Sequence, residues 1–197
     1  MKKYKRESNI NNNLITDEMI DFFFERTNSH IEKVKYYGQL VNRLPINDIS
    51  HFNHNIRIHD RSKFEYPEYK PYIILTWQKH LQQEGVNFKL STEIKHDIIL
   101  ATEHHTKSNE HHPEYWTEEI ENLINKNDRD GIPSKIINAT KMPEYAIAEM
   151  VCDWMAMSEE LNDDPYKWCE KVINKRWKFN QSQINLIFEI LDSVWNK

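Results

Sequence analysis

Glycine is scarce in this sequence, with only 3 residues in 197. This scarcity argues against a sheet-rich fold with many tight turns and against a glycine-rich phosphate-binding loop. There is no run of about 18 apolar residues, so we expect no membrane-spanning helix. The formal net charge is −5 with neutral histidines, so the composition favours no general affinity for a nucleic-acid duplex.

Cysteine is also rare, because Cys152 and Cys169 are the only two. They form no obvious disulfide framework and suit reduced thiols in a cytoplasm. The basic start of the chain is followed by polar residues 7–13, which is not typical of a secretion signal. Because 39% of the residues are hydrophobic, we expect a single soluble domain over residues 14–197 after a frayed segment over residues 1–13.

Apolar residues recur at helical spacing along most of the chain, which predicts an all-α, single-domain bundle of about seven helices. A first helix is expected to open at Thr16, which can cap it. The further helices are expected over residues 28–44, 49–58, 67–84, 91–105, 143–161, 168–178 and 182–195. Residues 125–133 are expected to form a charged loop.

The adjacent pair His59-Asp60 offers an imidazole nitrogen and a carboxylate, which are ligands for a divalent cation. Two ligands do not hold a metal, and such a pair is often only a polar surface dipeptide. The rest of the chain favours the metal interpretation. It supplies His30 upstream, a histidine-dense segment over residues 104–112, and Asp153 downstream.

Asp153 lies on an otherwise apolar helical stripe with Ala146, Met150 and Met157. An ionised carboxylate that faces a core is costly unless it is paired or bound to a metal. The alternative is a rotated helix that leaves Asp153 at the rim. Glu149 lies one turn earlier on nearly the same face, where it could orient a ligand, carry a proton, or simply be exposed.

Some of the histidines are candidate metal ligands, and the others are expected to be structural. His30 lies beside an apolar stripe and is either a satisfied core histidine or a ligand. Four histidines in nine residues predict that His105 and either His111 or His112 surround one cavity, although a surface cluster that includes His104 is the alternative. We expect the remaining histidines to be structural; they are His51, His54, His80 and His96.

Lys63 follows Asp60 by three residues and lies on the same side if the helix continues. A cation at this place could hold a phosphate oxygen or an anionic leaving group, whereas the alternative is a solvated charge. Arg57, Arg61 and Lys107 are weaker candidates for the same role.

The order of these residues resembles the HD superfamily of metal-dependent phosphohydrolases, from about Ser29 to Leu161. The resemblance implies an all-helical bundle of the HD type. It makes four residues the primary metal ligands, namely His30, His59, Asp60 and Asp153. It also implies that His105, with His111 or His112, supplies extra ligands for a second ion or contacts to phosphate.

Several local strings are similar to an uncharacterised group of bacterial and viral proteins, which implies the cytoplasm of a bacterial or virus-infected cell. These strings cover residues 59–64, 105–116 and 149–154. Two departures matter. Some HD nucleotidases carry a glutamate where this chain has Lys63, and the glycine-rich signature of the cyclic-dinucleotide branch is missing.

The resemblance implies hydrolysis of a phosphate ester or anhydride, with a nucleotide or another small phosphorylated metabolite as substrate. The implied cofactor is one or two divalent ions, from among Mn, Fe, Mg, Zn, Co and Ni. Lys63, Glu149 and His112 are the candidate catalytic residues. One alternative is an HD-type di-iron oxygenase, and another is a non-catalytic, metal-containing module that binds a nucleotide.

Overall fold

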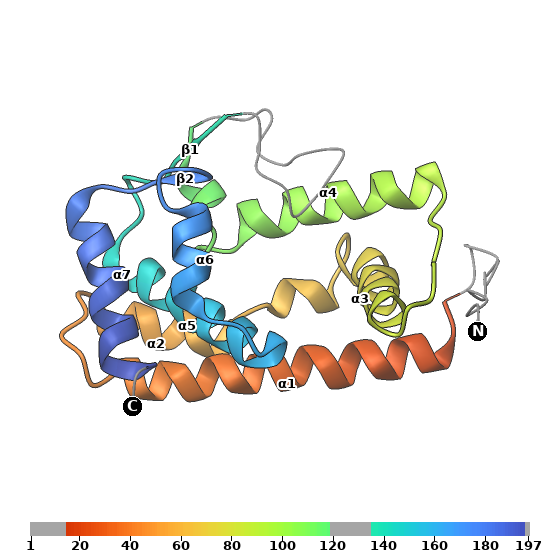
Figure 1. Ribbon diagram of the computed structural model, residues 1–197, viewed down its shortest axis with the longest axis horizontal. Coiled ribbons are helices and arrows are strands. Elements are labelled where there is room, and N and C mark those ends of the chain that lie inside the picture. The colour runs from red at the N-terminus through yellow and green to blue at the C-terminus, as the bar shows by residue number, and fades with distance from the viewer. Residues whose placement is uncertain (1–14, 119–134, 196–197) are drawn as a thin grey trace, which may run out of the picture.

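The computed structural model describes residues 15–118 and 135–195, and within them helices form almost all of the regular structure (Figure 1). The seven α-helices are α1 (Asp17–Val41), α2 (Ile49–Ile58), α3 (Tyr69–Gln83), α4 (Thr92–Ser108), α5 (Glu144–Leu161), α6 (Pro165–Val172) and α7 (Gln181–Val194). Two 3-10 helices, η1 (Arg61–Phe64) and η2 (Pro113–Trp116), and two short strands, β1 (Ile137–Asn138) and β2 (Trp177–Lys178), complete the order. The all-α prediction is therefore confirmed. No helix in these two described ranges has the length and apolarity to cross a membrane.

The first helix is longer than the sequence suggested. We expected a break near residue 28, but α1 is continuous for 25 residues. Its buried positions Phe23, Thr27, His30 and Val34 follow one another by three or four residues, so one stripe runs through the expected break. Neither glycine nor proline occurs before Gly38, and nothing ends the helix earlier. Thr16 caps it as predicted, because its hydroxyl accepts from the Met19 N–H at 3.3 Å.

The predicted helix over residues 168–178 is correct only over residues 168–172, which belong to α6. α6 begins earlier, at Pro165, after Asp164 accepts from the Tyr166 N–H at 3.0 Å. The chain then turns through Asn174, whose φ is 57°. It continues into β2, which pairs in parallel with β1. Asparagine often ends helical backbone because it adopts the left-handed region more readily than most residues. The prediction followed the apolar periodicity and did not use this signal.

The other helices agree closely with the prediction. α2 has the expected bounds, α7 begins and ends one residue earlier, and α5 begins at Glu144 directly after Pro143. Ser91 caps α4 through the Ile94 N–H at 3.3 Å. The expected loop over residues 125–133 and the expected frayed segment over residues 1–13 lie outside the described residues.

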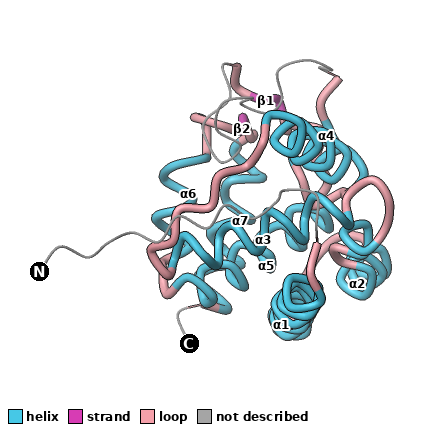
Figure 2. Tube along the Cα trace, turned by 90° about the vertical axis from the view of Figure 1, so that its right-hand side faces the viewer, coloured by secondary structure: helices cyan, strands magenta, loops and turns pink. Residues whose placement is uncertain are grey.

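Two apolar cores lie on either side of a polar centre. One surrounds α5, where side chains such as Ile147 and Met150 pack with α2, α6 and α7. The other joins the first half of α1 to α3 and α4 and includes Phe23. α1 runs along both, and α4 lies on the opposite side of the molecule from α1 (Figures 1 and 2). His30 lies on α1 between Phe23 of one core and Val34 of the other, so the polar centre is held between two packed regions.

Candidate metal centre

The His59-Asp60 pair lies just beyond α2 and not on a helix. α2 ends at Ile58, and Asp60 adopts left-handed backbone with φ 58°. Aspartate tolerates this region better than most residues, and such backbone often occurs at functional sites. Both side chains are buried, at 0% and 2% exposure. The turn therefore brings two neighbouring side chains into the same interior space, which a continuous helix would have separated by about 100°.

Asp60 lies at the middle of four histidines. Its Oδ2 atom is 3.8 Å from Nε2 of His30 and 3.8 Å from Nε2 of His59. Its Oδ1 atom is 3.3 Å from Nε2 of His105 and 3.9 Å from Nε2 of His111. The two oxygens of one carboxylate thus face two different pairs of imidazoles, which α1, α4 and the segments beside α2 and η2 supply.

Asp153 of α5 joins the side of the cluster that contains His30 and His59. Its Oδ1 atom is 2.9 Å from Nε2 of His30 and 3.9 Å from Nε2 of His59. Its side chain is 20% exposed, so it lies at the mouth of the cluster and still faces it. The structure therefore brings together all six residues that the sequence suggested as metal ligands: His30, His59, Asp60, His105, His111 and Asp153.

Each of these four histidines is held from behind by a carboxylate. The Nδ1–carboxylate distances are 2.8 Å for His30–Glu160, 2.9 Å for His59–Glu149, 2.8 Å for His105–Glu68 and 3.2 Å for His111–Glu149. An ionised carboxylate only accepts hydrogen bonds, so each Nδ1 carries the proton. In a neutral imidazole this leaves the lone pair on Nε2, which is the atom that faces Asp60. Such carboxylate–histidine pairs are typical of the supporting groups around bound metals.

Two polar atoms at the centre have no hydrogen-bond partner within the described ranges. They are Nε2 of His59 and Oδ1 of Asp60, and both are buried. A buried polar atom without a partner costs about 1–3 kcal/mol, and more if it is charged. A cation bound among these atoms would remove that cost. These buried His, Asp and Glu groups could therefore hold a metal ion, and their donor set suits a divalent one.

Charge inside the cluster shifts the pKa of its members. Burial by itself would lower the pKa of His30, but its hydrogen bonds to Asp153 and Glu160 outweigh burial and raise the pKa to about 9. Burial would raise the pKa of Glu149, but His111 and His59 outweigh it and lower the pKa to about 2. Without a metal, His30 therefore holds a proton at the place where a cation would bind.

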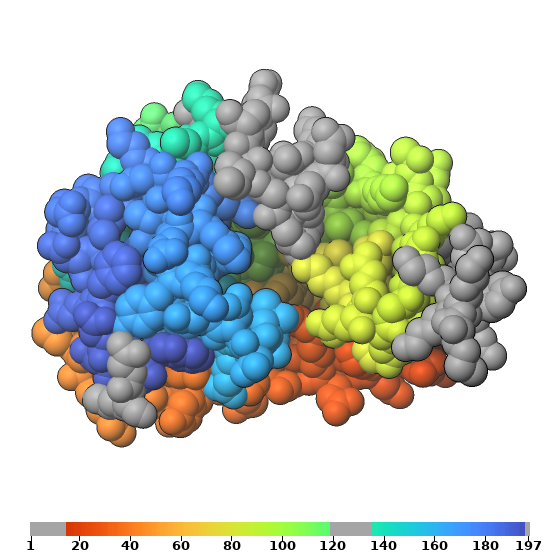
Figure 3. Space-filling view, in the orientation of Figure 1, coloured from red at the N-terminus to blue at the C-terminus, as the bar shows by residue number. Residues whose placement is uncertain are grey.

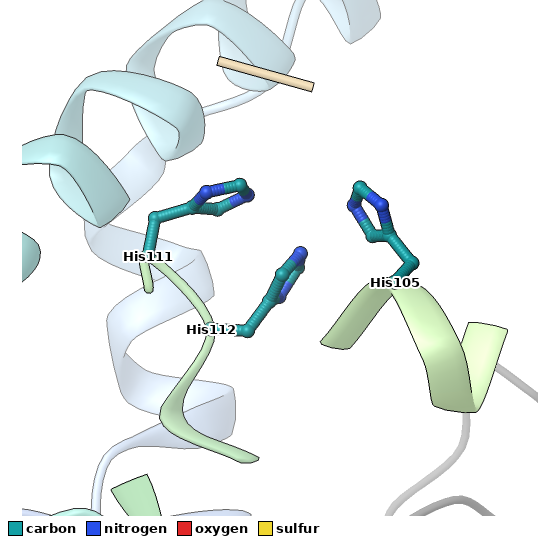
Figure 4. A group of neighbouring side chains, drawn as sticks. All are labelled: His105, His111 and His112. Carbon is teal, nitrogen blue, oxygen red and sulfur yellow. The ribbon is translucent and has the colours of Figure 1, made fainter. Parts of the chain in front are cut away.

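The histidine-dense segment contributes three rings. His105 from the end of α4 and His111 and His112 from the turn before η2 point toward a common space (Figure 4). One ligand atom from each ring lies within 4.8 Å of the others. Burial, together with the nearby His111 and His105, lowers the pKa of His112 well below its usual range, which keeps this ring neutral. His104 is 43% exposed and turns away to Glu68, so it is not part of the cluster.

Lys63 is the candidate cation that reaches the centre. η1 begins directly after Asp60, and the Nζ atom of Lys63 donates to Oδ2 of Asp60 at 2.5 Å. The weaker candidates Arg57 and Arg61 contact His54 and Glu65 instead. Lys63 therefore lies on the same side as Asp60, as its spacing of three residues predicted. A 3-10 turn, and not a continued helix, places it there.

Two cavities of about 240 and 220 Å³ meet at the cluster. Both are lined by His105, His111, His112 and Asp153. The smaller one adds the cations Arg26 and Lys63. The larger one adds apolar and aromatic side chains such as Met150 and Trp168, together with polar ones such as Arg176. A molecule bound over the cluster would thus have a cationic side and an apolar side.

Sequence reasoning missed two of the supporting carboxylates. Glu160 lies seven residues after Asp153, which is two helical turns along the same face of α5, so its spacing could have revealed it. Glu68 is fully buried and accepts from Ser62 as well as from His105. It precedes α3 and belongs to no periodic stripe, so no sequence signal identified it.

Comparison with known protein families gives a match over most of the chain. A family described as "Family of unknown function (DUF5662)" matches residues 19–193, a range that contains every residue of the cluster. No curated protein and no solved structure matches the chain.

Proposed function

This chain belongs to a family of unknown function (DUF5662), and for it we propose metal-dependent hydrolysis of a phosphate ester or anhydride, with a nucleotide or a related small metabolite as substrate. The observation that carries the proposal is the position of Asp60 between two pairs of histidines whose Nδ1 atoms are held by carboxylates. His30, His59, Asp60 and Asp153 would hold one divalent ion, and Asp60, His105 and His111 a second. A divalent cation in such a site lowers the pKa of water and polarises a phosphoryl oxygen.

The cations beside the cluster support phosphate as the group that reacts. Lys63 already lies against Asp60, and Arg26 lines the same cavity while it pairs with Glu160 at 3.2 Å. Positive side chains at this place would offset the charge on the phosphoryl oxygens and on the leaving oxygen. They would also concentrate an anionic substrate over a cluster that contains two ionised aspartates.

His112 and Glu149 would have different roles. His112 faces the cavity side with a buried Nε2 atom that has no partner among the described residues. As a neutral imidazole it can hydrogen-bond a phosphoryl oxygen or add a ligand beside His105 and His111. Glu149 lies behind the cluster, where one oxygen faces Nδ1 of both His59 and His111, so it orients ligands and does not touch the substrate.

The HD-type di-iron oxygenase is the second candidate. The favouring observation is the donor set itself, because four histidines and Asp153 around the carboxylate of Asp60 would also suit a pair of iron ions. The apolar lining of the larger cavity suits a carbon substrate. A metal-containing module that binds a nucleotide without turnover is the third.

One experiment separates these functions. Protein purified without oxygen is analysed for metals, then assayed for phosphate release from nucleotides and simple phosphate esters with Mn²⁺ or Mg²⁺, and for oxygen uptake with Fe²⁺. We expect phosphate release that His59→Ala abolishes together with bound metal. His96→Ala is the control, because His96 is an exposed residue of α4. Oxygen uptake without phosphate release would favour the oxygenase, and full metal content without either would favour the binding module.

A further inference from the structure

The wall of the larger cavity beside the metal centre includes a second polar group. Besides cluster residues, the wall includes Glu114 of η2 and Arg176, which precedes β2. Tyr72 of α3 and Trp168 of α6 also line it, and Figure 3 shows the surface hollowed between these two helices. The mechanism proposed above uses neither Glu114 nor Arg176.

Arg176 is held in a fixed position. Its backbone N–H donates to the Val172 carbonyl at 2.9 Å, and its carbonyl accepts from the Ile137 N–H at 2.9 Å. Its guanidinium carbon lies 4.8 Å from the ring centroid of Trp177, and its side chain is 13% exposed. A guanidinium that is anchored in this way loses little conformational freedom when it binds a ligand.

Glu114 lies beside this guanidinium and is fully buried. Its Oε1 atom accepts from the Trp177 indole N–H at 2.9 Å and lies 3.7 Å from Nη2 of Arg176, too far for a hydrogen bond. The Oε2 atom of Glu114 and the Nε atom of Arg176 have no hydrogen-bond partner among residues 15–118 and 135–195. A buried ion pair with unsatisfied atoms adds little to stability, so a binding role accounts for it better than a structural one.

The chemistry of this wall favours a neutral, flat group over a second anion. Glu114 and Asp163 line this cavity together with Arg176, so its lining carries no excess of positive charge there. Three indoles, those of Trp154, Trp168 and Trp177, line the same cavity, and the rings of Trp154 and Trp177 are stacked. The cations Lys63 and Arg26 are in the other cavity, on the side where an anionic group would bind.

We propose that the larger cavity binds a planar heteroaromatic ring of the substrate, with Arg176 as the specificity-determining residue that donates to an acceptor on the edge of the ring. Glu114 is a positioning residue that holds the guanidinium. The inference rests on the proposed function for the identity of the reacting group, because the ring would be joined to the phosphate that lies over the cluster. A base of a nucleotide has this chemistry.

The test is equilibrium binding of nucleosides, which carry a ring and no phosphate, to the full chain loaded with Mn²⁺. Guanosine, adenosine, uridine and cytidine are titrated by calorimetry, with ribose 5-phosphate as the probe without a base. We expect at least one nucleoside to bind, and Arg176→Met to weaken that binding about tenfold or more. Arg176→Lys keeps the charge without the planar donor group and should weaken binding nearly as much. Arg61→Gln is the matched control, because Arg61 is 75% exposed.

The outcomes separate this inference from the proposed function. Phosphate release from nucleotides with an unchanged KM in Arg176→Met would overturn the inference and leave the hydrolase intact. Binding of nucleosides that depends on Arg176, without any phosphate release, would support the inference and overturn the hydrolase. If ribose 5-phosphate binds as tightly as a nucleotide and Arg176→Met weakens both to the same extent, Arg176 binds an anion and the inference is wrong. Glu114→Gln should raise KM less than Arg176→Met and leave kcat nearly unchanged, whereas a purely structural role would lower thermal stability alone.

Discussion

The Nδ1 atom of His59 donates to Oε1 of Glu149 across 2.9 Å, and this bond fixes the proton on the side of the ring that faces away from Asp60. The same carboxylate oxygen lies 3.2 Å from Nδ1 of His111. The Nε2 atom of His111 faces Oδ1 of Asp60, whereas the Nε2 atom of His59 faces Oδ2. One glutamate thus orients a ring on each side of the cluster.

We therefore expect Glu149→Gln to weaken binding of divalent metal by roughly 10–100-fold, while the protein stays folded. The amide keeps the shape of the side chain but loses the charge that makes both imidazoles stronger ligands. Metal affinity is measured by competition with a chelator, and circular dichroism checks the fold. Unchanged affinity would show that Glu149 does not support a metal site.

Removal of metal should destabilise the protein. A metal that binds only the folded state raises the free energy of unfolding by about 2.7 kcal/mol when free metal is at 100 times its dissociation constant. For a chain of this size we expect a fall in Tm of roughly 5–10 °C after chelation. Thermal unfolding with and without added metal measures this shift. His59→Ala should show no such difference, and an equal shift in that variant would contradict the assignment.

The stability of the metal-free protein should depend on pH through His30. Its pKa of about 9 lies above the ordinary value of 6.5, so the protonated ring stabilises the fold. This contribution, on the order of 3 kcal/mol, is complete below about pH 6.5 and is lost as the pH rises through about 9. The difference in free energy of unfolding between wild type and His30→Gln, both with chelator, should shrink over this range. A constant difference would show that His30 is not protonated between Asp153 and Glu160.

Gly38→Ala should destabilise the contact between α1 and α2 even though alanine favours helices. A methyl group at Gly38 would lie 2.9–3.1 Å from three side-chain atoms of Ile56. Such overpacking costs about 1–3 kcal/mol, which exceeds the helix propensity gain of about 1 kcal/mol. Urea unfolding of Gly38→Ala, Ile56→Ala and the double variant measures the coupling. We expect Gly38→Ala to be neutral or stabilising when Ile56 is alanine, and stabilisation in the wild-type background would contradict this packing.

The sequence by itself determined the helical character of the protein and suggested the residues that cluster, with His111 and His112 left as alternatives. Helical periodicity is a local property, so α2, α4, α5 and α7 follow from the spacing of apolar residues. Unusual polar residues also reveal themselves locally, as Asp153 does on an apolar stripe and as the four histidines over residues 104–112 do. The break expected near residue 28 was wrong because a polar stretch of a helix looks like a helix end when the packing around it is unknown.

Only the tertiary structure decided how these residues meet. The left-handed backbone at Asp60 and the 3-10 turn after it are short-range features without periodicity, yet they aim two side chains and Lys63 at one place. Glu68 supports His105 across 37 positions of the chain, and Arg176 lies beside Glu114 across 62. Contacts of this kind depend on how helices pack against one another. The spacing of residues within a single helix does not predict that packing.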